Sequence, residues 1–147
     1  MTVHLVKMAV GIEDLDHLRE VQARRFAEAE RIDGVGRLRH MTRNTPRRST
    51  EVLDGGSIYW VMKGYIRARQ HIIGIEEATG RGSRKRCALI LSPDLARTVL
   101  TPHKPIQGWR YMEDAAAPED LGDDEIDPRD ASLPPNLAAE LRTLGLL

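Results

Sequence analysis

Residues 37–110 consist of short runs of alternating apolar and polar residues, and glycines or prolines separate these runs. Alternation with a period of two predicts β-strands that turn one face toward a core. Strands are expected over residues 3–10, 37–43, 57–63, 84–92 and 106–112, and residues 65–79 fit either a strand or a helix. The run Gly80-Arg81-Gly82-Ser83 predicts a hairpin turn, so the chain is constrained to a sheet of short strands.

Helices are expected before and between these strands. Residues 13–32 have apolar side chains near helical spacing and acids in the first turn, where the helix dipole favours them. Gly34 ends this long helix. Shorter helical segments are expected at residues 45–53, at residues 93–97 and from about residue 136 onward, where leucines form one stripe. In the first of these, Thr45 is the expected N-cap and Pro46 the first helical residue.

These elements predict an α+β fold with a small, mostly antiparallel sheet, either open or rolled into a barrel. One long N-terminal helix and a short C-terminal helix complete it. A single domain is expected over residues 1–112, which is an ordinary domain length, followed by an acidic tail over residues 113–147.

The lone cysteine, Cys87, lies in an apolar run and is expected to be a buried core residue in a reducing compartment. No run approaches the roughly 18 apolar residues that a membrane span needs. The N-terminus also lacks the pattern of a signal peptide. A cytoplasmic location without membrane contact is therefore expected.

Charge is strongly segregated along the chain, although the net charge of the whole is zero. Residues 37–110 hold 15 basic and 5 acidic residues, a net charge of +10, while residues 111–147 hold 2 basic and 10 acidic residues, a net charge of −8. The basic middle predicts a polyanion as partner, RNA first. The acidic tail is either a solvated linker or a segment that folds over the basic surface and competes with the polyanion.

No motif for catalysis or for a resident cofactor is present. The sequence has no GxSxG, GxxxxGK[ST] or GxGxxG motif, and no two of its five histidines have the spacing of a zinc site. Glu76 and Glu77 are adjacent, but neighbouring residues of a strand point to opposite faces and would not share a substrate. Neither a metal nor a cofactor is expected, and the sequence assigns no catalytic residue.

The basic residues cluster with polar and aromatic side chains in a way that suits an anionic ligand. Arginine forks pair with phosphates and flat rings stack on bases, the combination that readers of single-stranded RNA use. If Arg47 and Arg48 lie in the first turn of the short helix, a phosphate would also meet free backbone N–H groups. In the strand 57–63, alternation places Trp60 toward the core and leaves Tyr59 with Lys63 exposed. The candidate nucleic-acid or anion-binding residues are Arg43, Arg47, Arg48, Tyr59, Lys63, Arg67, Arg69, Gln107, Trp109 and Arg110.

Three functions compete for these residues. The first is nucleic-acid binding, with the cations on phosphates and Tyr59 or Trp109 on bases. The second is an enzyme or sensor for a small phosphorylated or carboxylated molecule, which a deep pocket holding Arg43, Gln107 and Trp109 would favour, whereas a broad flat face would favour RNA. The third is a protein-interaction module whose terminal leucine stripe docks on a partner or a second copy.

The chain resembles an uncharacterised domain-of-unknown-function family common in alphaproteobacteria. The segments that carry the resemblance are residues 40–43, Arg47-Arg48, 56–64 and 107–111, of which the two aromatic runs are the specific parts. The resemblance spans nearly the whole chain and implies a bacterial, cytoplasmic protein but no activity. A weaker likeness, of layout alone, is to PUA-like barrels of the ASCH and EVE kind, which implies binding of RNA or a modified base in an aromatic-lined cleft.

Overall fold

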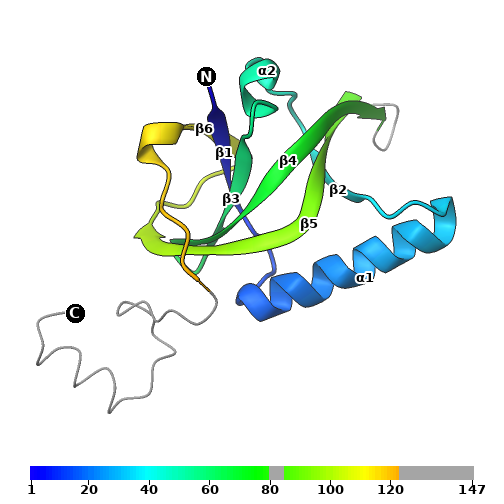
Figure 1. Ribbon diagram of the computed structural model, residues 1–147, viewed down its shortest axis with the longest axis horizontal. Coiled ribbons are helices and arrows are strands. Elements are labelled where there is room, and N and C mark those ends of the chain that lie inside the picture. The colour runs from blue at the N-terminus through cyan, green and yellow to red at the C-terminus, as the bar shows by residue number, and fades with distance from the viewer. Residues whose placement is uncertain (80–84, 123–147) are drawn as a thin grey trace, which may run out of the picture.

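The computed structural model describes residues 1–79 and 85–122, and within them it has six strands, one long helix and two short helical segments (Figure 1). The strands are β1 (Val3–Met8), β2 (Leu38–Thr42), β3 (Ser57–Met62), β4 (Tyr65–Thr79), β5 (Lys85–Pro102) and β6 (Trp109–Glu113). The helical segments are α1 (Leu15–Asp33), α2 (Ser49–Val52) and the 3-10 helix η2 (Asp114–Ala116). The expected turn at residues 80–83 and the expected terminal helix lie outside the described residues.

The strands form one open sheet in the order β2-β5-β4-β3-β1-β6. Every neighbouring pair is antiparallel except β1 with β3. The expected α+β fold with a mostly antiparallel sheet and a long N-terminal helix is therefore confirmed. Of the two expected forms of the sheet, the open one is observed, with β2 and β6 as its edges, and the closed barrel is not.

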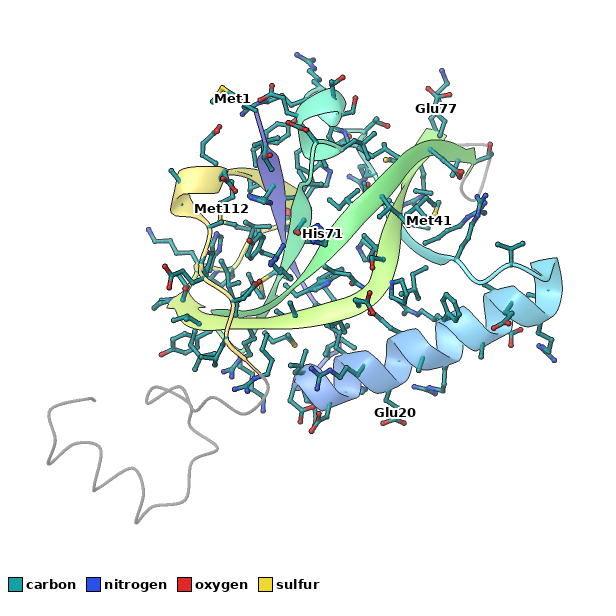
Figure 2. All side chains as sticks on the ribbon, viewed as in Figure 1. Met1, Glu20, Met41, His71, Glu77 and Met112 are labelled. Atoms are coloured by element: carbon teal, nitrogen blue, oxygen red, sulfur yellow. The ribbon has the colours of Figure 1, made fainter. Side chains whose placement is uncertain are left out.

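The expected helix at residues 13–32 is observed as α1, which starts two residues later, at Leu15, and ends at Gly34 as expected. The Asp14 carboxylate accepts a hydrogen bond from the backbone N–H of His17 at 2.8 Å and caps the N-terminus. Gly34, in the left-handed region at a φ of 72°, ends the helix. Leu18 and Gln22 are buried against the sheet, while Glu20 points away from it (Figure 2). The helix thus covers one face of the sheet with a single side.

The long hairpin of β4 and β5 corrects one expectation. Residues 65–79 are a strand throughout, but the expected helical turn at residues 93–97 is wrong, because β5 continues through it. Leu95 pairs with Gln70 and Arg97 pairs with Ala68 across the hairpin. Backbone partners on β4 therefore outweigh the local helical signal, since strand formation depends more on neighbours than on the residue itself.

Apolar side chains form clusters on both faces of the sheet. The larger cluster lies between the sheet and α1 and includes Leu5, Trp60 and Cys87, so the cysteine is a core residue as expected. The smaller cluster, on the opposite face, contains Val6, Tyr59, Val61 and Ile66, and Ile106, Met112 and Ala117 pack against it. Strand β3 is consequently buried on both of its faces.

The chain continues past β6 as residues 114–122, which cross β5 and which we call the strap (Figure 1). The backbone N–H of Val99 donates to the Glu119 carbonyl at 2.9 Å, and that of Leu121 donates to the Arg97 carbonyl at 2.8 Å. The Asp120 carboxylate accepts two hydrogen bonds from the Arg69 guanidinium, at 2.6 and 2.7 Å. The first part of the acidic segment thus packs on the sheet and pairs with the basic region.

Replacing Asp120 by asparagine is expected to lower the free energy of unfolding at pH 7 by about 1 kcal/mol, because it breaks the paired hydrogen bonds to Arg69. Those hydrogen bonds lower the pKa of Asp120. The contribution is therefore present at neutral pH and is lost as the pH falls below about 4. Urea unfolding would measure the loss, and Asp94→Asn, at an exposed acid of β5, should change stability by less than about 0.5 kcal/mol. Equal losses in the two variants would contradict a role for the strap pairing.

Candidate functional site

The two edges of the sheet approach each other where β2 ends. The Trp109 indole N–H donates to the Asn44 carbonyl at 3.1 Å, and the backbone N–H of Arg48 donates to the Tyr111 hydroxyl at 3.1 Å. These hydrogen bonds tie the segment after β2 to β6. Between the two lies a pocket of about 620 Å³, lined by residues of β1, of the segment 41–47 and of the segment 107–111. We call it the edge pocket.

Among residues 1–79 and 85–122, four cations and no acidic residue line the edge pocket. They are Lys7, Arg43, Arg47 and Arg110. Arg43 and Arg47 are exposed, and neither has an ion-pair or hydrogen-bond partner among residues 1–79 and 85–122. The Arg110 guanidinium donates to the backbone carbonyls of Gln107 and Trp109 at 2.8 and 2.9 Å, and it forms no ion pair with a carboxylate in the described part of the chain. The pocket therefore has a formal charge of +4 and attracts anions.

Burial lowers the pKa of Lys7, the one cation that reaches the edge pocket from β1. Desolvation of this kind makes an ammonium group bind an incoming anion more strongly, because less water competes for it. Lys7 therefore adds a partly desolvated charge to the lining that it shares with the exposed arginines.

Two aromatic rings stand beside these cations. The rings of Trp109 and Tyr111 meet edge to face, with centroids 4.9 Å apart and an interplanar angle of 68°. The hydrogen bond of Trp109 to Asn44 and this ring contact hold the indole in place. Trp109 is half-buried and Tyr111 is 36% exposed, so both rings have surface left for a ligand. A planar group could stack there while its anionic part meets the arginines.

The edge pocket gathers five of the ten candidate residues. These are Arg43, Arg47, Gln107, Trp109 and Arg110. They come from two segments that lie 60 residues apart in the sequence, counted from Arg47 to Gln107. Among them are Arg43, Gln107 and Trp109, the three residues that the second hypothesis expects in a deep pocket for a small ligand.

The other candidate cations lie elsewhere and most are engaged. Arg48 pairs with Glu51 at 2.6 Å and with Glu113 at 2.8 Å, and these hydrogen bonds, first that of Glu51, raise its pKa. Arg69 is bound to Asp120 of the strap. These arginines therefore do not add to a free basic surface.

Arg67 and Lys63 lie near the β3–β4 hairpin. The Arg67 Nε–H donates to the Met62 carbonyl at 2.7 Å, and its guanidinium lies over the Tyr65 ring. Lys63 is exposed in the two-residue turn with Gly64, where both residues have a positive φ, of 51° and 81°. Neither side chain lines the edge pocket.

The expected helix start at Thr45 and Pro46 is wrong. Helix α2 begins at Ser49, has Arg48 as its N-cap and spans four residues. The backbone N–H of Arg48 is already bound to the Tyr111 hydroxyl, so β6 holds this segment outside a helix. Arg47 therefore reaches the edge pocket with its side chain, and no helix N-terminus adds backbone N–H groups.

The expected exposure of Tyr59 is also wrong. Its ring is 3% exposed and meets the His4 ring edge to face at 5.1 Å. Burial raises the pKa of the Tyr59 hydroxyl. Residues 106–117 cover this face of β3, which the alternation within the strand could not reveal. Tyr59 is a core residue and is unavailable for stacking.

The sequence interpretation missed Lys7 and assigned no role to Tyr111. Lys7 lies on the same face of β1 as Val3 and Leu5, which are fully buried. A cation on the core face of an otherwise apolar strand is a signal that could have identified it, because such a charge needs a polar surrounding. For Tyr111 the signal was weaker: it lies two residues from Trp109, and residues two apart on a strand share one face.

Within the described residues, no group of three or more histidine, cysteine, aspartate or glutamate side chains is placed to hold a metal ion. In that same part of the chain, no helix combines the length and the apolar character that a membrane span requires.

A family model for proteins of unknown function, DUF1489, matches residues 5–147. The chain belongs to this family. Membership confirms the resemblance to a family of unknown function, and the match contains every residue of the edge pocket. DUF1489 carries no assigned activity, so the function has to be argued from the pocket itself. No curated protein matches the chain, and no solved structure does.

Proposed function

We propose that the edge pocket binds a phosphorylated ligand of mononucleotide size, either a free nucleotide or one nucleotide of an RNA strand. The observation that carries the proposal is a pocket whose described lining holds four cations, no acid and two partly exposed aromatic rings. Its volume of about 620 Å³ lies inside the range of roughly 300–1,000 Å³ typical of small-molecule sites.

The chemistry of the lining supports phosphate as the anion. Arg43 and Arg47 present free guanidinium forks, which bind two phosphate oxygens at once. Lys7 adds a point charge from β1. A phosphate carries a charge close to −2 at neutral pH and has three acceptor oxygens, so it can use several of these donors together.

The aromatic pair supports a planar ring on the same ligand. Trp109 and Tyr111 lie next to the cations, and a base stacked on an aromatic ring gains roughly 1–3 kcal/mol. An extended RNA track is less well supported than a single nucleotide unit, because Arg48 and Arg69 are already paired with carboxylates. A concave site with partnered arginines around it favours one bound unit.

The test is binding of the four nucleoside monophosphates by isothermal titration calorimetry, at two salt concentrations, with a matched set of variants. Arg43→Gln and Arg47→Gln are each expected to weaken binding by about 10-fold or more, since each removes a charged hydrogen bond. Lys63→Gln, at an exposed cation outside the pocket, should leave the affinity unchanged. Higher salt should weaken binding by the unsubstituted protein.

Two further ligands separate the sources of the phosphate. A short single-stranded RNA that binds more tightly than any mononucleotide would assign the pocket to a strand, and one that fails to compete would assign it to a free nucleotide. If inorganic phosphate binds as tightly as the nucleotides, the aromatic rings contribute nothing to the affinity. Absence of binding by all three ligands would overturn the proposal.

A further inference from the structure

A second, smaller cavity lies between α1 and the sheet and has a volume of about 120 Å³. We call it the inner cavity. Its polar lining residues are Lys7, Gln22, Arg25, Arg39, His40 and the indole of Trp60. Arg25 and Arg39 also line the surface groove beside α1, so the inner cavity opens to solvent through that groove. The volume is about four times the ~30 Å³ share of one water molecule, enough for a few heavy atoms and too little for a nucleotide.

His40 is the unsatisfied group of this cavity. Its Nε2 atom is buried and has no hydrogen-bond partner among the described residues. The ring lies edge-on to Trp60, with centroids 5.0 Å apart and an interplanar angle of 87°. Burial first, then the charges of Lys7 and Arg25, lower the pKa of His40 to about 4. At neutral pH the imidazole is therefore uncharged, with one ring nitrogen able to donate a hydrogen bond.

Three of the polar residues around the cavity, Gln22, Trp60 and Arg39, have other partners. Gln22 and Gln70 donate to each other at 2.9 and 2.8 Å, and the Trp60 indole N–H donates to Gln70 at 3.2 Å. Arg39 pairs with Glu76 at 3.7 Å. Two cations without a partner among the described residues, Lys7 and Arg25, remain next to a buried, unpaired ring nitrogen.

We propose that the inner cavity binds a small carboxylate of two to four carbons. Its oxygens would accept hydrogen bonds from His40, Lys7 and Arg25, and the charges of the two cations would balance that of the carboxylate. Its short apolar end would lie among Leu18, Leu38 and Leu91, which also line the cavity. None of the described residues that line the cavity is acidic, so none of them repels the anion. The size excludes larger anions, and the apolar wall favours a carboxylate over an inorganic anion. This site is separate from the edge pocket, with which it shares Lys7 alone.

The two tryptophans of the chain allow a direct test. Trp109→Phe leaves Trp60 as the single tryptophan, in ring contact with His40. Titration of this protein with sodium acetate, and separately with sodium butyrate, at constant ionic strength is expected to give a saturable change in Trp60 fluorescence. Adding Arg25→Gln should weaken that binding by about 10-fold, since it removes a charged partner. Adding Arg24→Gln, at the adjacent exposed arginine that lines the groove but not the cavity, should leave it unchanged.

A second readout follows the ring itself. In an NMR titration of the unsubstituted protein, saturating acetate should raise the pKa of His40, because a bound anion favours the charged imidazolium. A fluorescence change that does not saturate, or that is equal in the Arg24 and Arg25 variants with the pKa of His40 unmoved, would overturn the proposal. Phosphate that binds the cavity more tightly than acetate would overturn the assignment to carboxylates. Nucleotide binding to the unsubstituted protein is measured independently, so failure of one proposal leaves the other standing.

Discussion

Replacing Gly56 by alanine is expected to lower the free energy of unfolding by about 3 kcal/mol or more. A methyl group at this position would lie 2.3 Å from the carbonyl oxygen of Val52 and 2.4 Å from that of Val3. Both contacts are backbone atoms, so neither can turn aside as a flexible side chain would. The Gly56 N–H also donates to the Val52 carbonyl at 2.8 Å, and its carbonyl accepts from Ile72 at 3.0 Å. The clash therefore falls where α2, β1 and β4 meet.

The expected result is a melting temperature lower by roughly 10 °C, measured by circular dichroism. Gly55→Ala is the matched control at the adjacent residue. Gly55 has a φ of 82°, and its nearest neighbour to an added methyl group is the Thr2 hydroxyl at 4.0 Å. Alanine there carries backbone strain without a clash, which costs about 1–2 kcal/mol. A Gly56→Ala protein as stable as the Gly55→Ala protein would contradict the packing argument.

The free energy of unfolding is expected to fall by about 3 kcal/mol as the pH is lowered from 7 to 4, through His40 alone. The pKa of His40 is lowered to about 4 in the folded protein, with burial as the largest cause and the charges of Lys7 and Arg25 behind it. An unfolded chain binds a proton at an ordinary histidine below about pH 6.5. Between these values the unfolded state holds more protons, so acid favours unfolding.

The His40→Phe variant should lose this pH dependence between pH 6.5 and about 4.5, because it removes the titrating group and keeps a ring against Trp60. Urea unfolding at several pH values would measure the difference. Below that window both proteins should lose stability, because arginine partners lower the pKa values of Glu51 and Asp120 in the folded state. Parallel profiles for the two proteins throughout the acid range would show that His40 is not the responsible group.

Sequence patterns were sufficient to predict an element that is stabilised by contacts between residues close together in the chain. Helix α1 has a capping carboxylate at Asp14 and a glycine at Gly34, both within a few residues of the turns that they satisfy. Such contacts connect near neighbours in the chain, so the sequence shows them directly.

Local signals failed where a distant segment decides the outcome. Residues 93–97 look helical in isolation, yet β4 pairs with them through Gln70 and Ala68. Tyr59 looks exposed by alternation, yet residues from 106 onward cover it. The segment from Thr45 looks like a helix start, yet Tyr111, 63 residues from Arg48, binds the backbone there. Each error has the same cause, a contact between segments that the pattern of one segment does not record.

The sequence by itself determined the α+β class, the long helix and the strands other than β4 and the second half of β5. It also identified the basic region with Arg43, Arg47 and Trp109 as the candidate binding region. Only the tertiary structure decided which cations remain free. Arg48 and Arg69 pair with Glu113 and Asp120, which lie 65 and 51 residues away in the chain. Arg43, Arg47 and Arg110 instead meet Lys7 around one pocket, because hydrogen bonds from Trp109 to Asn44 and from Arg48 to Tyr111 hold the segment after β2 against β6, the opposite edge strand. The composition shows how many basic and acidic residues the chain has. Whether a given arginine is neutralised depends on which carboxylates the fold places within hydrogen-bonding distance of it.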